Sequence, residues 1–442
     1  DTSLNFFFFF KEVIEFWKKN VVFERSVTKN EGGEEFSFYD GPPTANGRPH
    51  VGHVLTRVMK DIIPRYRTMK GKHVLRKAGW DTHGLPVELE VEKILGLDGK
   101  PQIESYGIEP FISQCKQSVW KYKSEWETMS ERVGYWADMD NPYVTYDDNY
   151  IESEWWALKE MHKKGLLYKG HKIVPYCPRC GTALSSHEVA QGYKLVKENS
   201  AVARFKVKGS DNRYILAWTT TPWTLPSNVA LCMNPQENYV EIKSGEDKYI
   251  LAEALVGKFF EEYEVVCRKT GKEWEGLEYE PLFEETFVEV KRISPAAAPL
   301  KAHYVVCDGY VTMGDGTGVV HIAPAFGEDD YKVGKRYKLP VVQLVNERGC
   351  FDERFSSLEG LFAKKADKPI MDRLEKAGLL FKVLPYEHDY PHCWRCDTPL
   401  LYYAKSSWFI EVTKVKDKII AANRSVNWMP DNVKEGRMGN FL

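Results

Sequence analysis

The sequence has no apolar run long enough to cross a bilayer. A membrane-spanning helix needs ~20 consecutive apolar residues, whereas the phenylalanine run near the start, Phe6–Phe10, has five and is followed by the amphipathic pattern KEVIEFWKK. We draw no function from the phenylalanine run. A secretory signal pattern is also missing. We therefore expect a protein without a membrane partner.

Cysteine is too sparse for a disulfide framework. The nine cysteines of the 442 residues are odd in number and widely spread, unlike the dense, even sets of small secreted domains. This usage favours a reducing, cytoplasmic setting. Five cysteines stand alone and are interpreted as small buried hydrophobic residues: Cys115, Cys232, Cys267, Cys307 and Cys350.

Net charge is also nearly absent. The formal charge is −2, so no global basic field indicates nucleic acid, and an RNA partner would have to be held by local patches. Internal repeats and long low-complexity tracts are missing. A chain of this length is too long for a single core, and we expect two or three domains.

The clearest local pattern is a strand, loop, helix and second strand near the start. FSFY (36–39) is typical of a strand, and the apolar spacing from Val51 predicts a helix that buries one face. His73–Arg76 is predicted as the second strand, which makes a βαβ unit with a parallel sheet and a right-handed crossover. The loops Asp40–His50 and Ala78–Pro86 should then face one crevice. The apolar positions of the helix are Val51, Val54, Leu55, Val58, Met59, Ile62 and Ile63.

Two histidines stand at the predicted start of this helix. A helix N-terminus exposes unpaired N–H groups and attracts anions, and Gly52 lets a ligand approach the backbone. His50 and His53 could therefore donate to phosphate oxygens and stabilise charge in a transition state. A His-x-x-His metal site is the alternative.

Two cysteine pairs flank a long block. Cys177-x-x-Cys180 and Cys393-x-x-Cys396 supply four thiolates, enough for a closed, structural zinc site. Because 212 residues separate the pairs, the fold must bring them together as two knuckles. Redox-active dithiols are one alternative, and His187 or His392 as a substitute ligand is another.

The block between the pairs predicts an inserted β-rich domain. Its strand-like runs are YILAWTTT, NYVEI, KYILA, HYVVCDGYV, TGVVHIAP and VVQLV. Thr219, Thr220 and Thr221 end a strand before Pro222, and His321 ends another. Asp329 and Asp330 stand at a predicted helix start. Such groups could orient water at an ester and hold an ammonium; taken alone, the pattern equally fits a threonine-rich strand, a core histidine and an N-capping aspartate.

These motifs resemble those of class I aminoacyl-tRNA synthetases. GPPTANGRPHVGH (41–53) resembles their His-Ile-Gly-His region, with Val51 at the isoleucine position, and GWDTHGLPVE (79–88) is similar to isoleucyl members of the Ile/Val/Leu subgroup. The threonine and GTGVVHIAPAFGEDDY segments resemble the editing signatures of that subgroup, although AFGEDDY stands where many relatives have a second glycine and a histidine. The resemblance covers nearly the whole chain.

The resemblance implies an α/β fold, namely the first half of a Rossmann-type nucleotide-binding fold with zinc knuckles and an inserted β-rich editing domain. The implied segments are an N-terminal helical extension (1–35), the first half of the catalytic domain (36–170), a first knuckle (171–197), the editing domain (198–385), a second knuckle (386–410) and a return segment (411–442).

The implied activity is ATP-dependent activation of isoleucine, transfer to tRNA(Ile), and hydrolysis of valyl-tRNA(Ile). His50 and His53 would stabilise phosphoryl transfer from Mg²⁺-bound ATP. Asp81, with Trp80 and His83 beside it, would anchor the ammonium; its alternative is a helix N-cap. Gly41 and Pro42 would line the substrate pocket.

In the editing domain the resemblance gives the threonines and His321 the role of shaping the pocket, and Asp330 that of gripping the amino group. The string Lys-Met-Ser-Lys-Ser, the family's second ATP motif, does not occur, and the anticodon-binding region is missing. We therefore expect these 442 residues to edit but not to support isoleucine-dependent pyrophosphate exchange. A monomer is expected.

Three other interpretations stay open. The first is a valyl or leucyl synthetase of the same subgroup. The second is a zinc-dependent hydrolase that uses His50, His53 and His83, which predicts a second, catalytic zinc. The third is an RNA-binding module whose knuckles dock tRNA without catalysis.

Overall fold

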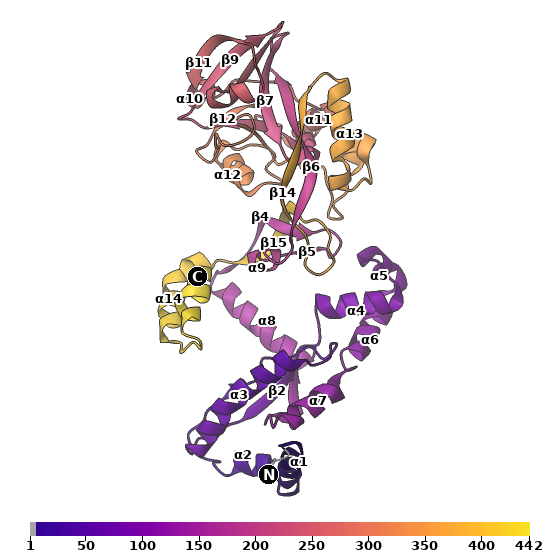
Figure 1. The fold of residues 1–442 in the computed structure, drawn as a ribbon, viewed down its shortest axis with the longest axis vertical. Coiled ribbons are helices and arrows are strands. Elements are labelled where there is room, and N and C mark those ends of the chain that lie inside the picture. The colour runs from indigo at the N-terminus through magenta and orange to yellow at the C-terminus, as the bar shows by residue number, and fades with distance from the viewer. Residues whose placement is uncertain (1–5) are drawn as a thin grey trace, which may run out of the picture. The chain divides into compact units, whose positions relative to one another are not determined.

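The computed structural model in Figure 1 describes residues 6–442. The chain divides into two compact units, one formed by the residues up to Tyr168 together with Ile410–Leu442, the other by Lys169–Phe409. The finer division into six segments stays a prediction, and the first five residues of its helical extension lie outside the described residues.

The first unit carries a small parallel sheet among helices. Strand β1 pairs with β2, and β2 pairs with β3, both parallel. The elements of this unit are α1 (Phe6–Lys19), α2 (Val22–Thr28), β1 (Phe38–Tyr39), α3 (Val51–Met69), β2 (Arg76–Trp80), α4 (Leu85–Leu95), α5 (Lys100–Tyr106), α6 (Ile108–Ser118), α7 (Lys123–Arg132), β3 (Asp138–Val144), α8 (Asp148–Lys163), η5 (Val412–Val415), α14 (Lys416–Ser425), η6 (Val433–Met438) and α15 (Gly439–Phe441).

The βαβ prediction is confirmed, but its second strand lies later than predicted. His73 makes only an isolated bridge with Glu35, and the strand itself runs over Arg76–Trp80 instead of His73–Arg76. The ladder continues to Trp80 because β3, more than 50 residues further on, pairs with Gly79 and Trp80. The predicted loop Ala78–Pro86 therefore begins as strand.

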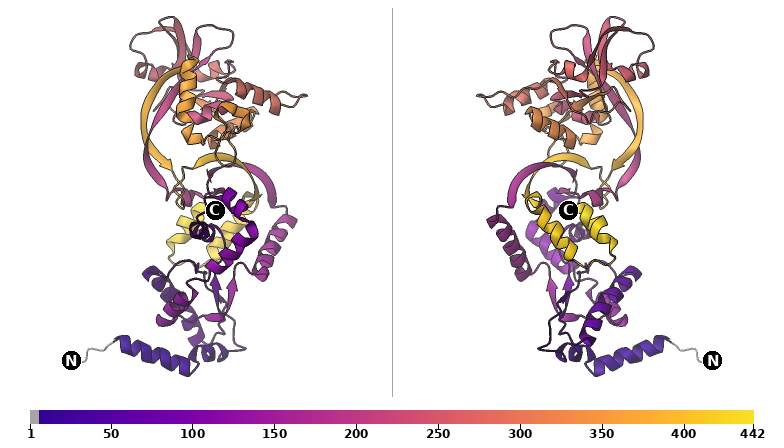
Figure 2. Two further views of the ribbon diagram at one scale, coloured as in Figure 1. Left: turned by 90° about the vertical axis from the view of Figure 1, so that its right-hand side faces the viewer. Right: turned by 90° about the vertical axis from the view of Figure 1, so that its left-hand side faces the viewer.

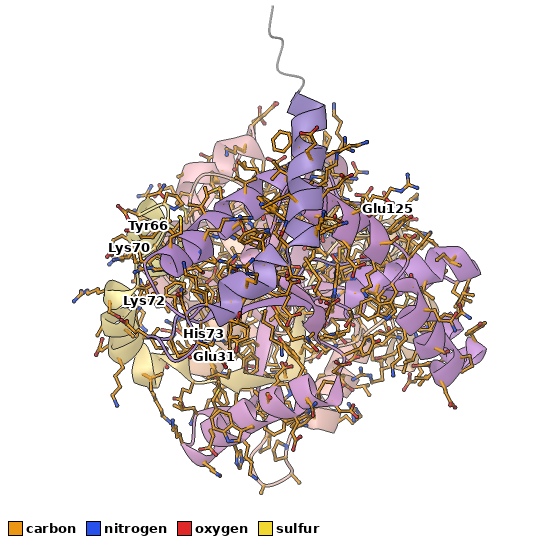
Figure 3. All side chains as sticks on the ribbon, turned by 90° about the horizontal axis from the view of Figure 1, so that it is seen from below. Glu31, Tyr66, Lys70, Lys72, His73 and Glu125 are labelled. Atoms are coloured by element: carbon orange, nitrogen blue, oxygen red, sulfur yellow. The ribbon has the colours of Figure 1, made fainter. Side chains whose placement is uncertain are left out.

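The predicted buried face of α3 is wrong for most of its positions. Val54 is half-buried, but the other six apolar positions are exposed. The helix instead buries Arg57 and Pro64, because Arg57 pairs with the buried Asp40 at the end of β1. Figure 3 labels Tyr66, which lies in the last part of α3, and Lys70, Lys72 and His73, which lie between α3 and β2.

The second unit is built around a nine-stranded mixed sheet. The strand order is β11-β9-β10-β7-β13-β8-β12, with β6 added on β7 and β14 on β6. The elements are β4 (Leu167–Cys177), β5 (Thr182–Ala183), α9 (Ser186–Val189), β6 (Tyr193–Lys206), β7 (Arg213–Thr219), η1 (Pro222–Ser227), β8 (Ala230–Met233), β9 (Asn238–Ser244), β10 (Asp247–Ala252), η2 (Glu253–Lys258), β11 (Glu264–Thr270), α10 (Gly271–Trp274), α11 (Glu284–Ile293), β12 (Tyr304–Cys307), β13 (Val319–Ile322), α12 (Glu328–Tyr337), η3 (Glu353–Leu358), η4 (Ala363–Lys365), α13 (Asp367–Lys376), β14 (Leu380–Pro391) and β15 (Leu401–Ile410).

The β-rich character predicted for this block is confirmed, with one strand wrong. VVQLV (341–345) lies in the core without forming a strand; Val342, Leu344 and Val345 are buried, and only Val345 makes an isolated bridge, with Phe351. The apolar run is therefore explained by burial rather than by a ladder. The long strands β6 and β14 form a curved antiparallel ribbon that leads away from the cysteine-bearing β4 (Figure 2).

Candidate functional site

The two histidines cap the N-terminus of α3. His50 is the N-cap, and its Nδ1 accepts a hydrogen bond from the Gly52 N–H at 3.2 Å. The Nδ1 of His53 in turn accepts from the His50 N–H at 3.1 Å, and the ring centroids lie 3.7 Å apart. The predicted position at the helix start is confirmed. Desolvation, followed by the charge of His50, lowers the pKa of His53.

A pocket of about 340 Å³ opens beside this helix start. Gly41, Pro42 and His53 line it, together with Lys60. The Lys60 ammonium lies 2.7 Å from the buried Asp40 carboxylate and donates to the Gly41 carbonyl at 3.2 Å. This pairing fixes the Gly-Pro loop and leaves cationic groups next to His53, an arrangement that suits an anionic ligand.

The second loop lies against the first, but among the described residues only the first loop lines the pocket, so the predicted shared crevice is not seen. Asp81 bridges Thr44, and its N–H donates to the Pro43 carbonyl at 3.0 Å. The N-cap of α4 is Gly84, so the alternative role of Asp81 as that N-cap is wrong.

The structure does not gather all the predicted ligands of this site around the pocket. Asp81 is half-buried. Trp80 is 1% exposed and packs in a cluster with Trp126 and Val144, and His83 contacts the Thr145 hydroxyl at 2.8 Å. Among the described residues, the pocket lining includes His53 but not His50, Trp80, Asp81 or His83.

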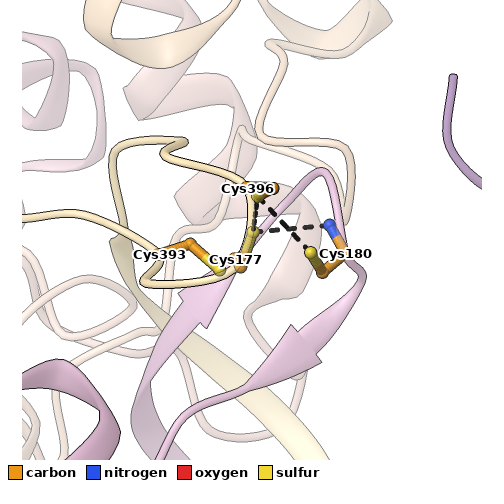
Figure 4. Close-up of side chains that lie close together, drawn as sticks. All are labelled: Cys177, Cys180, Cys393 and Cys396. Atoms are coloured by element: carbon orange, nitrogen blue, oxygen red, sulfur yellow. Dashed lines mark hydrogen bonds between the residues drawn. The ribbon is translucent and has the colours of Figure 1, made fainter. Parts of the chain in front are cut away.

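The four paired cysteines meet in space. Their Sγ atoms all lie within 4.8 Å of one another, with Cys396 Sγ 3.5 Å from that of Cys177 and 3.4 Å from that of Cys180 (Figure 4). The Cys180 N–H also points to the Cys177 sulfur, at 3.4 Å. The fold therefore closes the 212-residue gap, as the sequence predicted.

This geometry fits a zinc ion held by the four thiolates. Zn–S bonds of about 2.3 Å in a tetrahedron place the sulfurs roughly 3.8 Å apart, which agrees with the observed spacing. Within residues 6–442, this is the only gathered set of potential metal ligands. His187 and His392 are not in it, and His50, His53 and His83 form no such set.

A chain of polar contacts joins the threonine segment to His321. The Thr221 N–H donates to the Thr219 hydroxyl at 3.1 Å, and the Thr221 hydroxyl lies 3.4 Å from that of Thr224. Thr224 then contacts His321 Nε2 at 2.9 Å. Thr220 is half-buried beside these residues. Sequence reasoning missed Thr224; its spacing three residues after Thr221, within WTTTPWT, was the available signal.

His321 is held as a neutral imidazole. It is 7% exposed, and desolvation lowers its pKa to about 4. Its Nδ1 is buried and has no hydrogen-bond partner in the described part of the chain. A neutral, buried ring can make hydrogen bonds to a substrate or to water without carrying a charge.

Asp330 lies in the first turn of α12. Its carboxylate folds back and accepts a hydrogen bond from the Ala323 N–H at 2.9 Å. Burial raises its pKa to about 7. A Cβ added at Gly327 would lie 2.7 Å from the Asp330 Cγ, so glycine at this position makes room for the carboxylate. The predicted placement at a helix start is confirmed.

Comparison with known proteins shows which family the chain belongs to. The family model of class I tRNA synthetases (I, L, M and V) matches residues 12–442. The chain is 58% identical over its whole length to a protein of Clostridium acetobutylicum named isoleucine–tRNA ligase, and 58% identical to one of that name from Clostridium novyi; each match covers 42% of the relative. A Bacillus thuringiensis protein of the same name is 52% identical over 96% of the chain and 40% of its own length. The chain thus spans less than half the length of these relatives. In the described part, no helix has both the length and the apolar character of a membrane span.

Proposed function

Since the chain belongs to the class I tRNA synthetases of the isoleucine, leucine, methionine and valine group, we propose that it serves in charging tRNA(Ile) with isoleucine and hydrolyses valyl-tRNA(Ile). The high identity to proteins named isoleucine–tRNA ligase supports this choice of amino acid. The observation that carries the hydrolytic part is the contact chain from Thr219 to His321, with the Asp330 carboxylate bonded to the N–H of Ala323, two residues after His321.

In the proposed hydrolysis, water attacks the ester carbonyl of valyl-tRNA(Ile) and releases valine and the free 3′-terminal hydroxyl. Asp330 holds the ammonium of the valyl group through a charge-assisted hydrogen bond. The hydroxyls of Thr219, Thr221 and Thr224 and the neutral His321 position the ester and limit the space for the side chain. No covalent intermediate with the protein is needed.

A hydrolytic site is needed because the first selection is weak. One methylene, for which isoleucine against valine is the standard example, is worth only about 1–3 kcal/mol in a hydrophobic pocket. A second pocket that is too small for isoleucine and hydrolytic towards valine supplies the missing discrimination.

We assign the pocket beside α3 to ATP and isoleucine. In that reaction the isoleucine carboxylate attacks the α-phosphate of Mg²⁺-bound ATP, which gives isoleucyl-adenylate and releases pyrophosphate. His53 would stabilise the charge that develops, and His50 would act through the helix cap that it shares with His53. Gly41 and Pro42 would line the substrate pocket, with Asp81 as the ammonium anchor beside Trp80 and His83. The cations Lys60 and Arg57 next to this pocket support an anionic substrate.

We further propose that Cys177, Cys180, Cys393 and Cys396 hold a structural zinc ion. A site closed by four thiolates leaves no open position for substrate, so the ion would fix the base of the β6–β14 ribbon. A cytoplasmic location and a monomeric state complete the proposal.

The deciding experiment compares hydrolysis of valyl-tRNA(Ile) and isoleucyl-tRNA(Ile) by this chain. We expect the valyl ester to be cleaved at least ~100-fold faster, because the pocket must exclude the cognate side chain. Equal rates would refute an editing pocket, and no hydrolysis would favour the RNA-binding interpretation. A zinc-dependent hydrolase would instead lose its activity with the metal.

A further inference from the structure

The 3-10 helix η1, which carries Thr224, is anchored at its first N–H by a side chain from elsewhere in the fold. Pro222 has no N–H, and the next residue, Trp223, has no partner for its N–H within the helix because helical bonds leave the first donors open. The Asp367 carboxylate accepts this hydrogen bond at 2.8 Å. The contact joins positions that are 144 residues apart.

The anchoring carboxylate is itself held in place. Asp367 is the first residue of α13, and its side chain is 17% exposed. The Lys364 ammonium, 9% exposed, lies 3.9 Å from Asp367 and 2.6 Å from Glu198 of β6. Lys364 also sits 4.3 Å from the ring centroid of Tyr390. A carboxylate that is mostly shielded from water, with a similarly shielded cation beside it, has little freedom to move.

Trp223 contacts both segments that carry the proposed hydrolytic residues. It is 3% exposed, and it directly precedes Thr224, whose hydroxyl contacts His321. Its indole packs edge-on against Phe326 with the ring centroids 4.9 Å apart, and Phe326 directly precedes Gly327, the residue that makes room for Asp330. A shift of Trp223 would therefore move the threonine segment and the segment that holds Asp330 together.

We propose that Asp367 is a positioning residue of the hydrolytic site, which fixes the Trp223 backbone and thereby the spacing between Thr224, His321 and Asp330. Asp367 acts through the Trp223 N–H that it holds. This inference rests on the proposed hydrolysis of valyl-tRNA(Ile), and it adds a residue that the motifs of the sequence did not single out.

The acceptor oxygen, rather than the charge, is what this role requires. Burial raises the pKa of Asp367 to about 7, with Lys364 opposing the shift. Both the carboxylate and the protonated acid keep an oxygen that can accept from the Trp223 N–H. An asparagine keeps such an oxygen as well, whereas an alanine leaves the buried N–H without a partner.

The test uses the whole 442-residue chain with the variants Asp367→Ala and Asp367→Asn. Asp372→Ala, which removes a half-exposed carboxylate from the same helix, is the control. We expect Asp367→Ala to lower kcat for valyl-tRNA(Ile) about tenfold or more with little change in KM, the size of effect seen when a buried polar group loses its partner. Asp367→Asn should stay within about threefold of the wild type. The ratio of valyl to isoleucyl hydrolysis should fall in Asp367→Ala, because Thr224 and His321, which are proposed to exclude isoleucine, are held less firmly.

A second measurement does not depend on activity. Amide hydrogen exchange over residues 221–228 should speed up about tenfold in Asp367→Ala, and should match the wild type in Asp367→Asn and Asp372→Ala. Unchanged exchange, or a folded Asp367→Ala that keeps the wild-type kcat and substrate ratio, would overturn the positioning role. If Asp367→Asn lowered kcat and raised exchange as much as Asp367→Ala does, an acceptor oxygen alone would not explain the role of Asp367. Failure of the wild type itself to hydrolyse valyl-tRNA(Ile) would instead refute the proposed function, while the exchange result still decides whether Asp367 fixes Trp223.

Discussion

The hydroxyl of Thr224 lies 2.9 Å from Nε2 of His321, across 97 positions of sequence. This contact joins the end of β7 and the 3-10 helix after it to the end of β13. Because the imidazole is neutral and its other nitrogen has no partner in the described part of the chain, Thr224 is the group that fixes the ring.

Replacing Thr224 by valine tests this contact. The variant keeps the shape of the side chain but leaves Nε2 of the buried His321 without its partner, which should lower the free energy of unfolding by about 1–3 kcal/mol. Hydrolysis of valyl-tRNA(Ile) should fall by roughly tenfold or more. Urea denaturation and a deacylation assay measure the two effects. The exposed Thr413→Val is the control; a Thr224→Val protein with full activity would argue against the contact chain.

Asp330 should make the chain less stable as the pH rises. Its pKa is raised to about 7 in the folded state, above the ordinary value near 3.8. Between these two pH values the folded state therefore binds more protons than the unfolded state. The contribution of Asp330 to the free energy of unfolding is fully present below about pH 4, where the side chain is protonated in both states, and is lost as the pH rises through about 7. Asp330→Asn should therefore melt above the wild type at pH 8 and close to it at pH 4.

The same variant separates stability from function. Asparagine cannot pair with the ammonium as a carboxylate does, so Asp330→Asn should hydrolyse valyl-tRNA(Ile) at least ~10-fold more slowly despite its higher melting temperature at pH 8. Thermal melts between pH 4 and pH 8, run beside the deacylation assay, provide both readings. A variant that melts lower than the wild type at pH 8 would contradict burial as the cause of the shifted pKa.

Gly327→Ala probes the room behind the Asp330 carboxylate. The backbone of Gly327 is extended and accepts alanine, so any effect must come from the added Cβ, which would lie 2.7 Å from Cγ of Asp330. We expect the carboxylate to leave the Ala323 N–H, with a loss of about 1–3 kcal/mol in unfolding free energy and of most hydrolysis. Gly309→Ala, where a Cβ meets nothing within 4 Å, should behave like the wild type.

Cys177→Ser tests the proposed zinc site. Because one sulfur of the four is replaced by a poorer ligand, we expect the zinc content to fall from one ion per chain to near zero, with a lower melting temperature. Elemental analysis of the purified protein gives the count. Cys350→Ser, an isolated cysteine, should keep the metal. Two ions in the wild type, or one retained in Cys177→Ser, would refute the assignment.

The sequence by itself determined the local features that depend on neighbouring residues. The Pro/Gly loop, the helix that His50 caps and the parallel partner strand follow from spacing and turn chemistry over a few residues. The two Cys-x-x-Cys pairs predicted that the fold brings the four cysteines together, because four thiolates in such pairs are typical of a structural zinc site. The threonines at a strand end and the aspartate in a first helical turn were likewise visible as patterns.

Only the tertiary structure decided which of these groups touch. The end of β2 depends on β3, the buried face of α3 depends on the Asp40–Arg57 pair, and the run VVQLV is buried without a ladder. Thr224 and Asp367 carried no signal strong enough to single them out, because their partners, His321 and the Trp223 N–H, lie about 100 positions or more away. Contacts between residues so far apart in the sequence depend on how the whole chain packs, and a local sequence pattern does not predict them.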